Sequence, residues 1–173
     1  MFHLILSVLL ATLIGCSHTP AVTDPSHPHV VKIHDGDTIT VVSQGMSQRV
    51  RLAGIDCPET DQPYGAEATE ATKSLALNRD VTVTPVTTDR YGRTVAEVNL
   101  QDGRSLTHEL VKAGACWWYR KYAPSDAELE RLETEARKQH RGVWATDQPM
   151  PPWEWRAQRL DAQTTYPSSS NGP

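Results

Sequence analysis

Short β-branched segments separated by tight-turn signals fill the first part of the chain, and they constrain its fold most. Residues 29–34 and 38–42 have the composition of strands, and the Asp-Gly-Asp between them at residues 35–37 is typical of a tight turn. A second turn at residues 44–45 leads to a third predicted strand over residues 48–55. Three consecutive strands with such short connections predict a meander.

Helices and two further strands follow this meander. We predict helices over residues 64–77, 105–113 and 125–140, and strands over residues 81–86 and 94–100. Pro85 has no amide hydrogen to donate, which places the end of the fourth strand at a sheet edge or a bulge. Five strands, with one helix after the third and more after the fifth, predict a mainly β, α+β fold. The expected architecture is a five-stranded OB-fold barrel with about three helices, a class that commonly binds nucleic acids and sugars.

The composition limits the size of any nucleic-acid-binding surface. The 173 residues are 38% hydrophobic and 22% charged, which suits one globular domain with additional ends. The formal net charge of −4 argues against a broad basic surface. It leaves room for a small site at which a few arginines gather.

The amino-terminal end has the features of an export signal. Residues 4–15 are apolar, too few to cross a bilayer but suited to the core of a signal peptide. Cys16 follows in the order Leu-Ile-Gly-Cys, which resembles the bacterial lipobox, whose cysteine carries lipid after cleavage. We therefore predict a lipoprotein signal peptide over residues 1–15, lipidation of Cys16 and a flexible tether over residues 16–28. The alternative is an ordinary signal peptide with an incidental cysteine.

A lipid anchor predicts a location in the cell envelope. In Gram-negative lipoproteins, the absence of Asp after the lipidated cysteine favours the outer membrane, and Ser17 stands at that position here. We expect the protein at the outer membrane facing the periplasm, or at the cell surface. The folded domain is predicted over residues 29–146, and residues 147–173 as a Pro- and Trp-containing extension with a disordered tail from Ala162.

Four carboxylates lie near predicted turns or strand ends, namely Asp35, Asp37, Asp56 and Glu59. Oxygen ligands in this number suit a hard cation such as Ca²⁺ or Mg²⁺. The alternative is that Asp-Gly-Asp serves only the chemistry of a hairpin turn. A site for a softer metal is not expected, because the seven histidines show no paired ligand spacing.

Arg51 and Arg93 provide the opposite charge. A guanidinium is a planar fork of donors that binds a phosphate in two places, although a single arginine is often only a solvated surface residue. Arg93 ends the sequence Asp-Arg-Tyr-Gly-Arg, in which Gly92 permits a bend and Tyr91 can pack on a sugar or base.

An aromatic cluster, Trp117, Trp118, Tyr119 and Tyr122, adjoins Arg120 and Lys121. Aromatic rings interleaved with cations can stack nucleobases while the cations hold the backbone. The alternative is core filling, and we expect at least one of the two tryptophans to be buried.

Two cysteines besides Cys16 remain, Cys57 and Cys116. An exported protein can form disulfides, and two such cysteines make an even count. From these residues alone, a Cys57–Cys116 bridge and two unpaired buried thiols both stay open.

Three motifs in register resemble the staphylococcal nuclease (thermonuclease) family. They are Asp-Gly-Asp-Thr at residues 35–38, Val-Arg-Leu followed by Ile-Asp-Cys-Pro-Glu-Thr within residues 50–60, and Asp-Arg-Tyr-Gly-Arg at residues 89–93. Residues 109–114 resemble the family helix that precedes its sugar- and base-contacting aromatics. The likeness runs from about residue 29 to residue 144, and Pro-Pro-Trp-Glu-Trp-Arg at residues 151–156 resembles an extension of bacterial members.

This resemblance implies an OB-fold and a calcium-dependent endonuclease that cuts DNA and RNA and leaves 3′-phosphate ends. It implies that Asp37 and Asp56 bind Ca²⁺ through their side chains, and Cys57 through its backbone carbonyl. Asp35 is then close to the ion, and Glu59 reaches it through water and acts as the general base.

The resemblance also assigns the basic and aromatic residues. Arg51 and Arg93 are expected to bind the scissile phosphate, and Tyr91 and Tyr122 to contact the substrate. We expect the protein to act as a monomer.

In the family fold, the segment after Asp56 runs beside the segment after Gly114, which favours the bridge between Cys57 and Cys116. Two other functions compete with catalysis. One is a non-catalytic nucleic-acid-binding OB-fold lipoprotein, and the other is a structural lipoprotein that binds envelope polymers. The presence of every charged residue of the motifs favours the enzyme.

Overall fold

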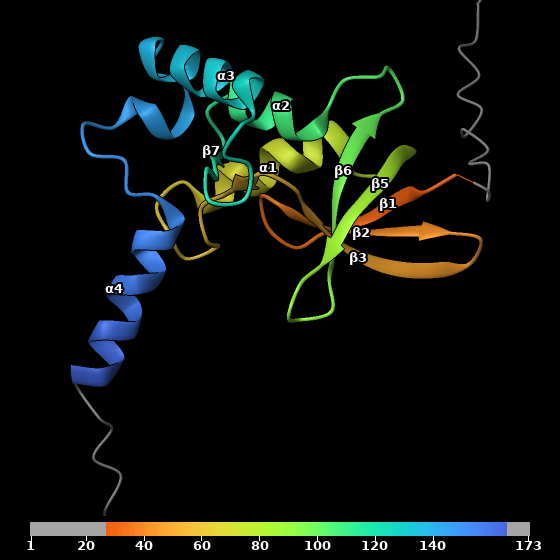
Figure 1. Ribbon diagram of the computed structural model, residues 1–173, viewed down its shortest axis with the longest axis horizontal. Coiled ribbons are helices and arrows are strands. Elements are labelled where there is room, and N and C mark those ends of the chain that lie inside the picture. The colour runs from red at the N-terminus through yellow and green to blue at the C-terminus, as the bar shows by residue number, and fades with distance from the viewer. Residues whose placement is uncertain (1–26, 166–173) are drawn as a thin grey trace, which may run out of the picture.

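The computed structural model describes residues 27–165, and Figure 1 shows their arrangement as a mixed α+β fold. One sheet has the strand order β1-β2-β3-β6-β5, formed by β1 (His29–Ile33), β2 (Thr38–Ser43), β3 (Met46–Leu52), β6 (Thr94–Leu100) and β5 (Val81–Thr88). Its neighbouring strands pair antiparallel except β3 and β6, which run parallel; the chain between these two strands includes α1 (Gly65–Ala76) and β5, long enough for the crossover that parallel strands require. This is the predicted five-stranded OB-fold.

The two edge strands of the sheet meet at one end. The Val30 amide donates to the Arg79 carbonyl at 2.9 Å, and the Asn78 amide donates to the Val30 carbonyl at 2.9 Å. The Val81 amide donates to the Pro28 carbonyl at 2.8 Å. The start of β1 is thereby bonded to the chain that enters β5, which curls the sheet toward a barrel.

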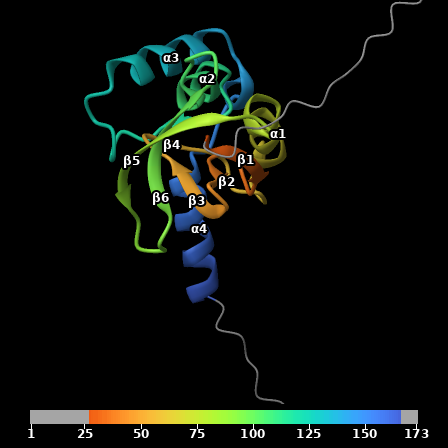
Figure 2. The same ribbon diagram turned by 90° about the vertical axis from the view of Figure 1, so that its right-hand side faces the viewer.

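Helices cover one end of this sheet, and α2 (Leu106–Lys112) packs between α1 and α3 (Ala127–Lys138) (Figures 1 and 2). Ser105 caps α2 as predicted, because its hydroxyl accepts the His108 amide at 3.3 Å. The cap of α3 is Asp126, one residue after the start of the predicted helix, and its carboxylate accepts two amides of the first turn. A 3₁₀ turn (Gly142–Ala145) follows α3.

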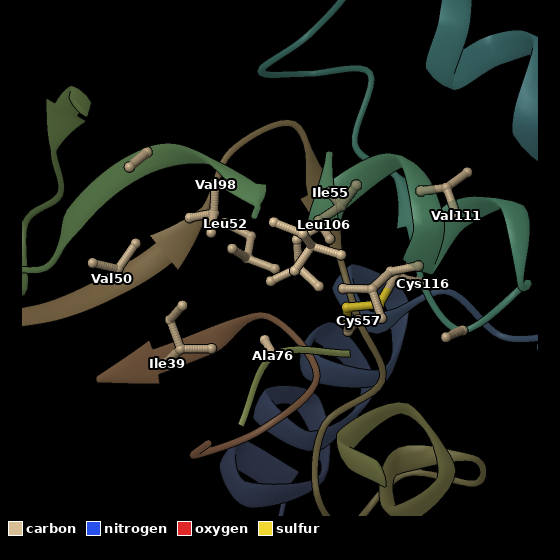
Figure 3. Close-up of a cluster of buried hydrophobic side chains, with 14 of the residues drawn as sticks. Ile39, Val50, Leu52, Ile55, Cys57, Ala76, Val98, Leu106, Val111 and Cys116 are labelled. Atoms are coloured by element: carbon tan, nitrogen blue, oxygen red, sulfur yellow. A yellow bond between two sulfur atoms is a disulfide. The ribbon is translucent and has the colours of Figure 1, made fainter. Parts of the chain in front are cut away.

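A two-stranded ribbon of β4 (Ile55–Asp56) and β7 (Trp117–Trp118) is separate from the main sheet. Asp56 pairs with Trp117, so Cys57 and Cys116 occupy the next opposed position, and the structure joins them by a disulfide. Both cysteines are buried in the main core. Figure 3 shows the disulfide among side chains from strands and from α2, including Leu52, Ile55, Val98, Leu106 and Val111.

The tryptophans of the aromatic cluster fill the interior. Trp117 and Trp118 are both buried, so the expectation that at least one would be buried is confirmed. The Trp118 indole donates to the Ala123 carbonyl at 2.8 Å, and the Trp117 ring packs edge-to-face on Trp144 with centroids 5.2 Å apart. These two rings support the fold and are not a surface for nucleobases.

Three local features differ from the sequence-based expectations or refine them. The predicted third strand over residues 48–55 is divided, because β3 ends at Leu52 and Gly54, with a φ of +76°, turns the chain into β4. β5 carries its irregularity between Pro85 and Thr87, which confirms the predicted bulge. The extension forms a fourth helix, α4 (Pro152–Thr165), where no helix was predicted and where the disordered tail was expected from Ala162.

The predicted signal peptide, the lipidation site at Cys16 and most of the tether lie outside the described residues, as does the end of the tail from residue 166. Among residues 27–165, no helix combines the length and the apolar character needed to cross a bilayer.

Candidate active site

Charged side chains from distant segments meet where β2 begins, β3 ends and β6 begins, and they form one hydrogen-bonded network. The network runs in order through Asp89, Arg93, Thr38, Asp37, Arg51, Asp56, Arg156 and Glu59. It contains all five charged residues that were predicted to bind the metal, bind the phosphate or act as the base through their side chains. Asp35, predicted to lie close to the ion, is not a member.

The strand register explains this meeting. Thr38 at the start of β2 is paired with Arg51 near the end of β3, and Arg51 is paired with Val95 at the start of β6. Asp37 and Arg93 immediately precede β2 and β6, respectively, so the register places both of them beside Arg51.

Asp37 is buried and fully engaged. Its Oδ2 accepts the Cys57 amide at 2.8 Å, while its Oδ1 accepts the Thr38 hydroxyl at 3.2 Å and lies 3.1 Å from Nε of Arg51. The Asp35 carboxylate accepts the Asp37 amide at 3.0 Å, which places it in the same turn. The turn therefore does two things at once: it closes the hairpin and aims a carboxylate inward.

Arg51 bridges the carboxylates of Asp37 and Asp56. Its Nε faces Asp37, its Nη2 donates to Oδ1 of Asp56 at 3.0 Å, and its Nη1 donates to the Leu52 carbonyl at 2.9 Å. Asp56 itself is buried. Because the guanidinium is planar, these three acceptors leave it little freedom to rotate.

Arg93 reaches the same site from the turn before β6. Its Nε donates to Oδ2 of Asp89 at 2.7 Å, and its Nη1 lies 3.3 Å from the Thr38 hydroxyl. Asp89 also accepts the amides of Tyr91 and Arg93, both at 2.9 Å, so one carboxylate shapes the turn and orients the arginine.

Glu59 lies on the loop between β4 and α1, and this loop is packed tightly. A Cβ on Gly65 would lie 2.0 Å from the Glu59 carbonyl oxygen, so only glycine fits at the start of α1. The Glu59 amide donates to the Gln62 side chain at 3.1 Å. The carboxylate of Glu59 is about one-third exposed, at 37%. A fixed backbone with an accessible carboxylate suits a group that works on a water molecule.

Arg156 of α4 completes the network and was not among the predicted site residues. Its Nη1 lies 2.7 Å from Oε1 of Glu59, and its Nη2 lies 2.7 Å from Oδ2 of Asp56. The residue pair Asp56 and Arg156 is separated by 100 positions in the chain, so no local spacing could have revealed it. The only available signal was its place in the Pro-Trp-rich motif of the extension.

Tyr91 stands at the outer edge of this site. It is 70% exposed, and it lines a shallow pocket of about 340 Å³ with Arg49, Gly92 and Arg93. The guanidiniums of Arg90 and Arg93 lie 4.9 and 5.6 Å from its ring centroid. A ring flanked by cations is a suitable platform for a nucleotide, and Arg49 is an addition to the predicted set.

Tyr122 is exposed as well, and its ring contacts are made outside the network. Its ring packs edge-to-face on Tyr119 at 5.0 Å and lies near the Lys121 ammonium. A substrate contact at Tyr122 stays a prediction.

The donors at this site fit a hard cation. The pKa of Asp37 is raised to about 7, mainly because the carboxylate is buried; the Arg51 charge and the Cys57 amide lower it, and the nearby charges of Asp35 and Asp56 raise it. Every candidate ligand is an oxygen, as Ca²⁺ prefers. In the described part of the chain, no three His, Cys, Asp or Glu side chains are gathered in the manner of a metal site, and arginines lie between the carboxylates.

Carboxylates and arginines alternate at one end of the OB-fold, so this site has groups that can bind a cation beside groups that can bind a phosphodiester. Comparison with known families matches residues 49–146 to the staphylococcal nuclease homologue family. The chain belongs to this family, which makes it a nuclease, a hydrolase that acts on nucleic acid.

Bacterial relatives cover most of the chain. A protein of Escherichia coli O157:H7 named "uncharacterized endonuclease" is 43% identical over 137 residues, which are 79% of this chain and 89% of the relative. A "micrococcal nuclease" of Shigella flexneri is 39% identical over 136 residues, covering 73% and 78% of the two chains. An "uncharacterized endonuclease" of Haemophilus influenzae is 38% identical over 146 residues, covering 81% and 80%.

Proposed function

We propose that this protein is a calcium-dependent endonuclease that hydrolyses DNA and RNA and leaves 3′-phosphate ends. The observation that carries the proposal is the single network in which Asp37 and Asp56 share Arg51, while Arg93 and Glu59 stand at its two sides. A non-catalytic nucleic-acid-binding module would need the arginines but would have no use for two buried carboxylates and a third that is partly exposed.

The residues that would hold the ion are Asp37 and Asp56 by side chain and Cys57 by backbone carbonyl, with Asp35 nearby. When bound, the ion would supply positive charge that polarises the phosphate and neutralises its oxygens. The disulfide to Cys116 and the hydrogen bond from the Cys57 amide to Asp37 hold the Cys57 peptide in place.

The other residues then have separate tasks. Glu59 acts as the general base on the attacking water, because one of its oxygens is bonded to Arg156 and the other has no hydrogen-bond partner within residues 27–165. Arg51 and Arg93 stabilise the charge that grows on the equatorial phosphate oxygens. Tyr91 and Arg49 guide the adjoining nucleotide into place. The water attacks phosphorus in line with the departing 5′-oxygen.

We also propose a cellular location for the enzyme. Export by residues 1–15 and lipidation of Cys16 would anchor the enzyme in the cell envelope, with residues 16–28 as the tether to the folded domain. Support comes from the apolar run and the Leu-Ile-Gly-Cys order alone. Metabolic labelling with a radioactive or clickable fatty acid, compared between the wild type and Cys16→Ser, tests this part.

The chemistry of the products tests the reaction. We expect purified protein in calcium to cut a single-stranded DNA oligonucleotide and a matched RNA oligonucleotide internally. The fragments should carry 3′-phosphate and 5′-hydroxyl ends, because the 5′-oxygen is the leaving group. Mass spectrometry of the fragments, before and after treatment with a 3′-phosphatase, distinguishes these ends from 5′-phosphates. Fragments with 5′-phosphate and 3′-hydroxyl ends would contradict the proposed direction of attack.

A further inference from the structure

We propose that Arg156 is a positioning residue of the active site, which ties the carboxylate of Glu59 to that of Asp56, and that α4 is the brace that holds it there. This inference rests on the proposed function, in which Glu59 is the general base and Asp56 a metal ligand. It makes the carboxy-terminal extension a working part of the enzyme, although the family match ends at residue 146.

The geometry of Arg156 is that of a clamp. One nitrogen, Nη1, is 2.7 Å from Oε1 of Glu59 and 3.3 Å from Oδ1 of Asp56, while Nη2 is 2.7 Å from Oδ2 of Asp56. A rigid planar fork that binds both carboxylates fixes their relative position. Partial burial disfavours the charged form of Arg156, but the hydrogen bonds and charges of both carboxylates outweigh it and raise the pKa of the guanidinium above its usual range.

Helix α4 is docked by more than this one residue. Trp153, Arg156 and Arg159 are spaced three apart and share one helix face. The Trp153 ring stacks on Tyr119 with centroids 5.2 Å apart and planes 3° apart, and Arg159 pairs with Asp61.

The chain just before α4 is also tied to the loop that carries Glu59. The Gln62 side-chain amide donates to the Met150 carbonyl at 2.7 Å, and the same Gln62 accepts the Glu59 amide. One face of α4 and the segment just before it therefore contact the loop after β4 at several points. The far part of α4 stands away from the barrel in Figures 1 and 2, so the contact is made by its first turns.

The side chain of Glu59 depends on this clamp for its orientation. Within the described residues, Arg156 is the hydrogen-bonding and ion-pairing partner of its carboxylate, which is otherwise accessible to solvent. Without Arg156, the flexible Glu59 side chain would sample several rotamers, and its free oxygen would no longer be aimed at one place. Within residues 27–165, the hydrogen bonds and cation–ring contacts of Arg93 and Tyr91 are made outside α4, so substrate binding should be spared.

The charges predict a second, independent readout. Removal of Arg156 takes a positive charge away from Asp56, so calcium alone should bind the variant as tightly as it binds the wild type, or more tightly. A positioning role therefore lowers the turnover without lowering the affinity for calcium.

The test compares Arg156→Ala with Arg131→Ala, a control arginine on α3 whose partners, Glu128 and Glu135, lie outside both the network and the contacts of α4. We expect Arg156→Ala to lower kcat on a single-stranded DNA oligonucleotide by about tenfold to a hundredfold. Its KM, and its Kd for calcium in a calorimetric titration of the metal alone, should be no higher than in the wild type. Arg131→Ala should keep the wild-type kcat. Arg156→Lys should recover part of the loss, because an ammonium pairs with one carboxylate but cannot bridge both.

Three outcomes would overturn the proposal. An unchanged kcat in Arg156→Ala would show that Arg156 does not contribute to catalysis. A higher kcat together with tighter calcium binding makes Arg156 a competitor of the metal. A fall in kcat matched by weaker calcium binding assigns the loss to the metal site. If Arg156→Ala does not fold by circular dichroism, Arg156→Gln, which keeps a polar side chain without the charge, replaces it in the same comparison. A wild type that binds no calcium and cuts no nucleic acid refutes the proposed function as well, whereas the three outcomes above refute this proposal alone.

Discussion

Replacement of Arg93 with alanine should lower the rate of phosphodiester hydrolysis by about a hundredfold or more, the usual cost of removing one donor to a charged transition state. The reason is the position of its guanidinium, which bonds to Asp89 and reaches the Thr38 hydroxyl; that hydroxyl in turn donates a hydrogen bond to Asp37. The free energy of unfolding should change by no more than about 1 kcal/mol, since Asp89 keeps the two amide hydrogen bonds of the turn. Initial rates on a DNA oligonucleotide, with urea unfolding alongside, measure both effects.

Arg104 offers a matched control for this variant. It follows the opposite end of β6 and repeats the local arrangement, because its amide and its guanidinium both bond to Asp102 in the preceding turn. Arg104→Ala should keep the wild-type rate. Full activity in a folded Arg93→Ala protein would remove Arg93 from the phosphate site, and an equal loss in Arg104→Ala would point to a general effect of charge.

Loss of the disulfide should have the largest effect on stability. The bond links positions 59 residues apart in sequence, and closing a loop of that size lowers the entropy of the unfolded chain. Replacement of both Cys57 and Cys116 with alanine should therefore lower the free energy of unfolding by about 4 kcal/mol. Urea unfolding of the variant and the oxidised wild type, monitored by tryptophan fluorescence, gives the difference.

The reduced wild type separates the effect of the bond from that of the side chains. With the same two thiols in place but no bond, it should show most of the same loss of stability. A thiol titration of denatured, unreduced protein that finds Cys57 and Cys116 both free would contradict the pairing. Equal midpoints for oxidised and reduced protein would show that the bond adds nothing to stability.

Local signals predicted the strands well because turns and β-branched residues act at short range. The strands β1, β2, β5 and β6 fall within a residue or two of the predicted ranges. The third strand was predicted too long, because the prediction continued the strand through Gly54, whose positive φ bends the chain. Helix α4 was missed because its Pro-rich start and few apolar residues have little helical periodicity, and its docking depends on single contacts such as Trp153 on Tyr119.

The site was predictable only in part, and for a physical reason. Carboxylates and arginines in turns identify candidate chemistry, but their meeting depends on the parallel pairing of β3 with β6, which no short window contains. The family resemblance supplied that arrangement for Asp37, Arg51 and Arg93. It did not supply Arg156, whose ion pair with Asp56 joins the extension to the barrel. It also placed Tyr122 in the substrate pocket, and this stays a prediction for an exposed ring that packs on Tyr119.

The most direct test of the central claim is the initial rate at which the wild-type protein digests single-stranded DNA in calcium, and in the same buffer with excess EGTA. We predict rapid cleavage in calcium, no cleavage above the enzyme-free control in EGTA, and full recovery when calcium is restored in excess. Equal rates in calcium and in EGTA would contradict a calcium-dependent nuclease at Asp37 and Asp56.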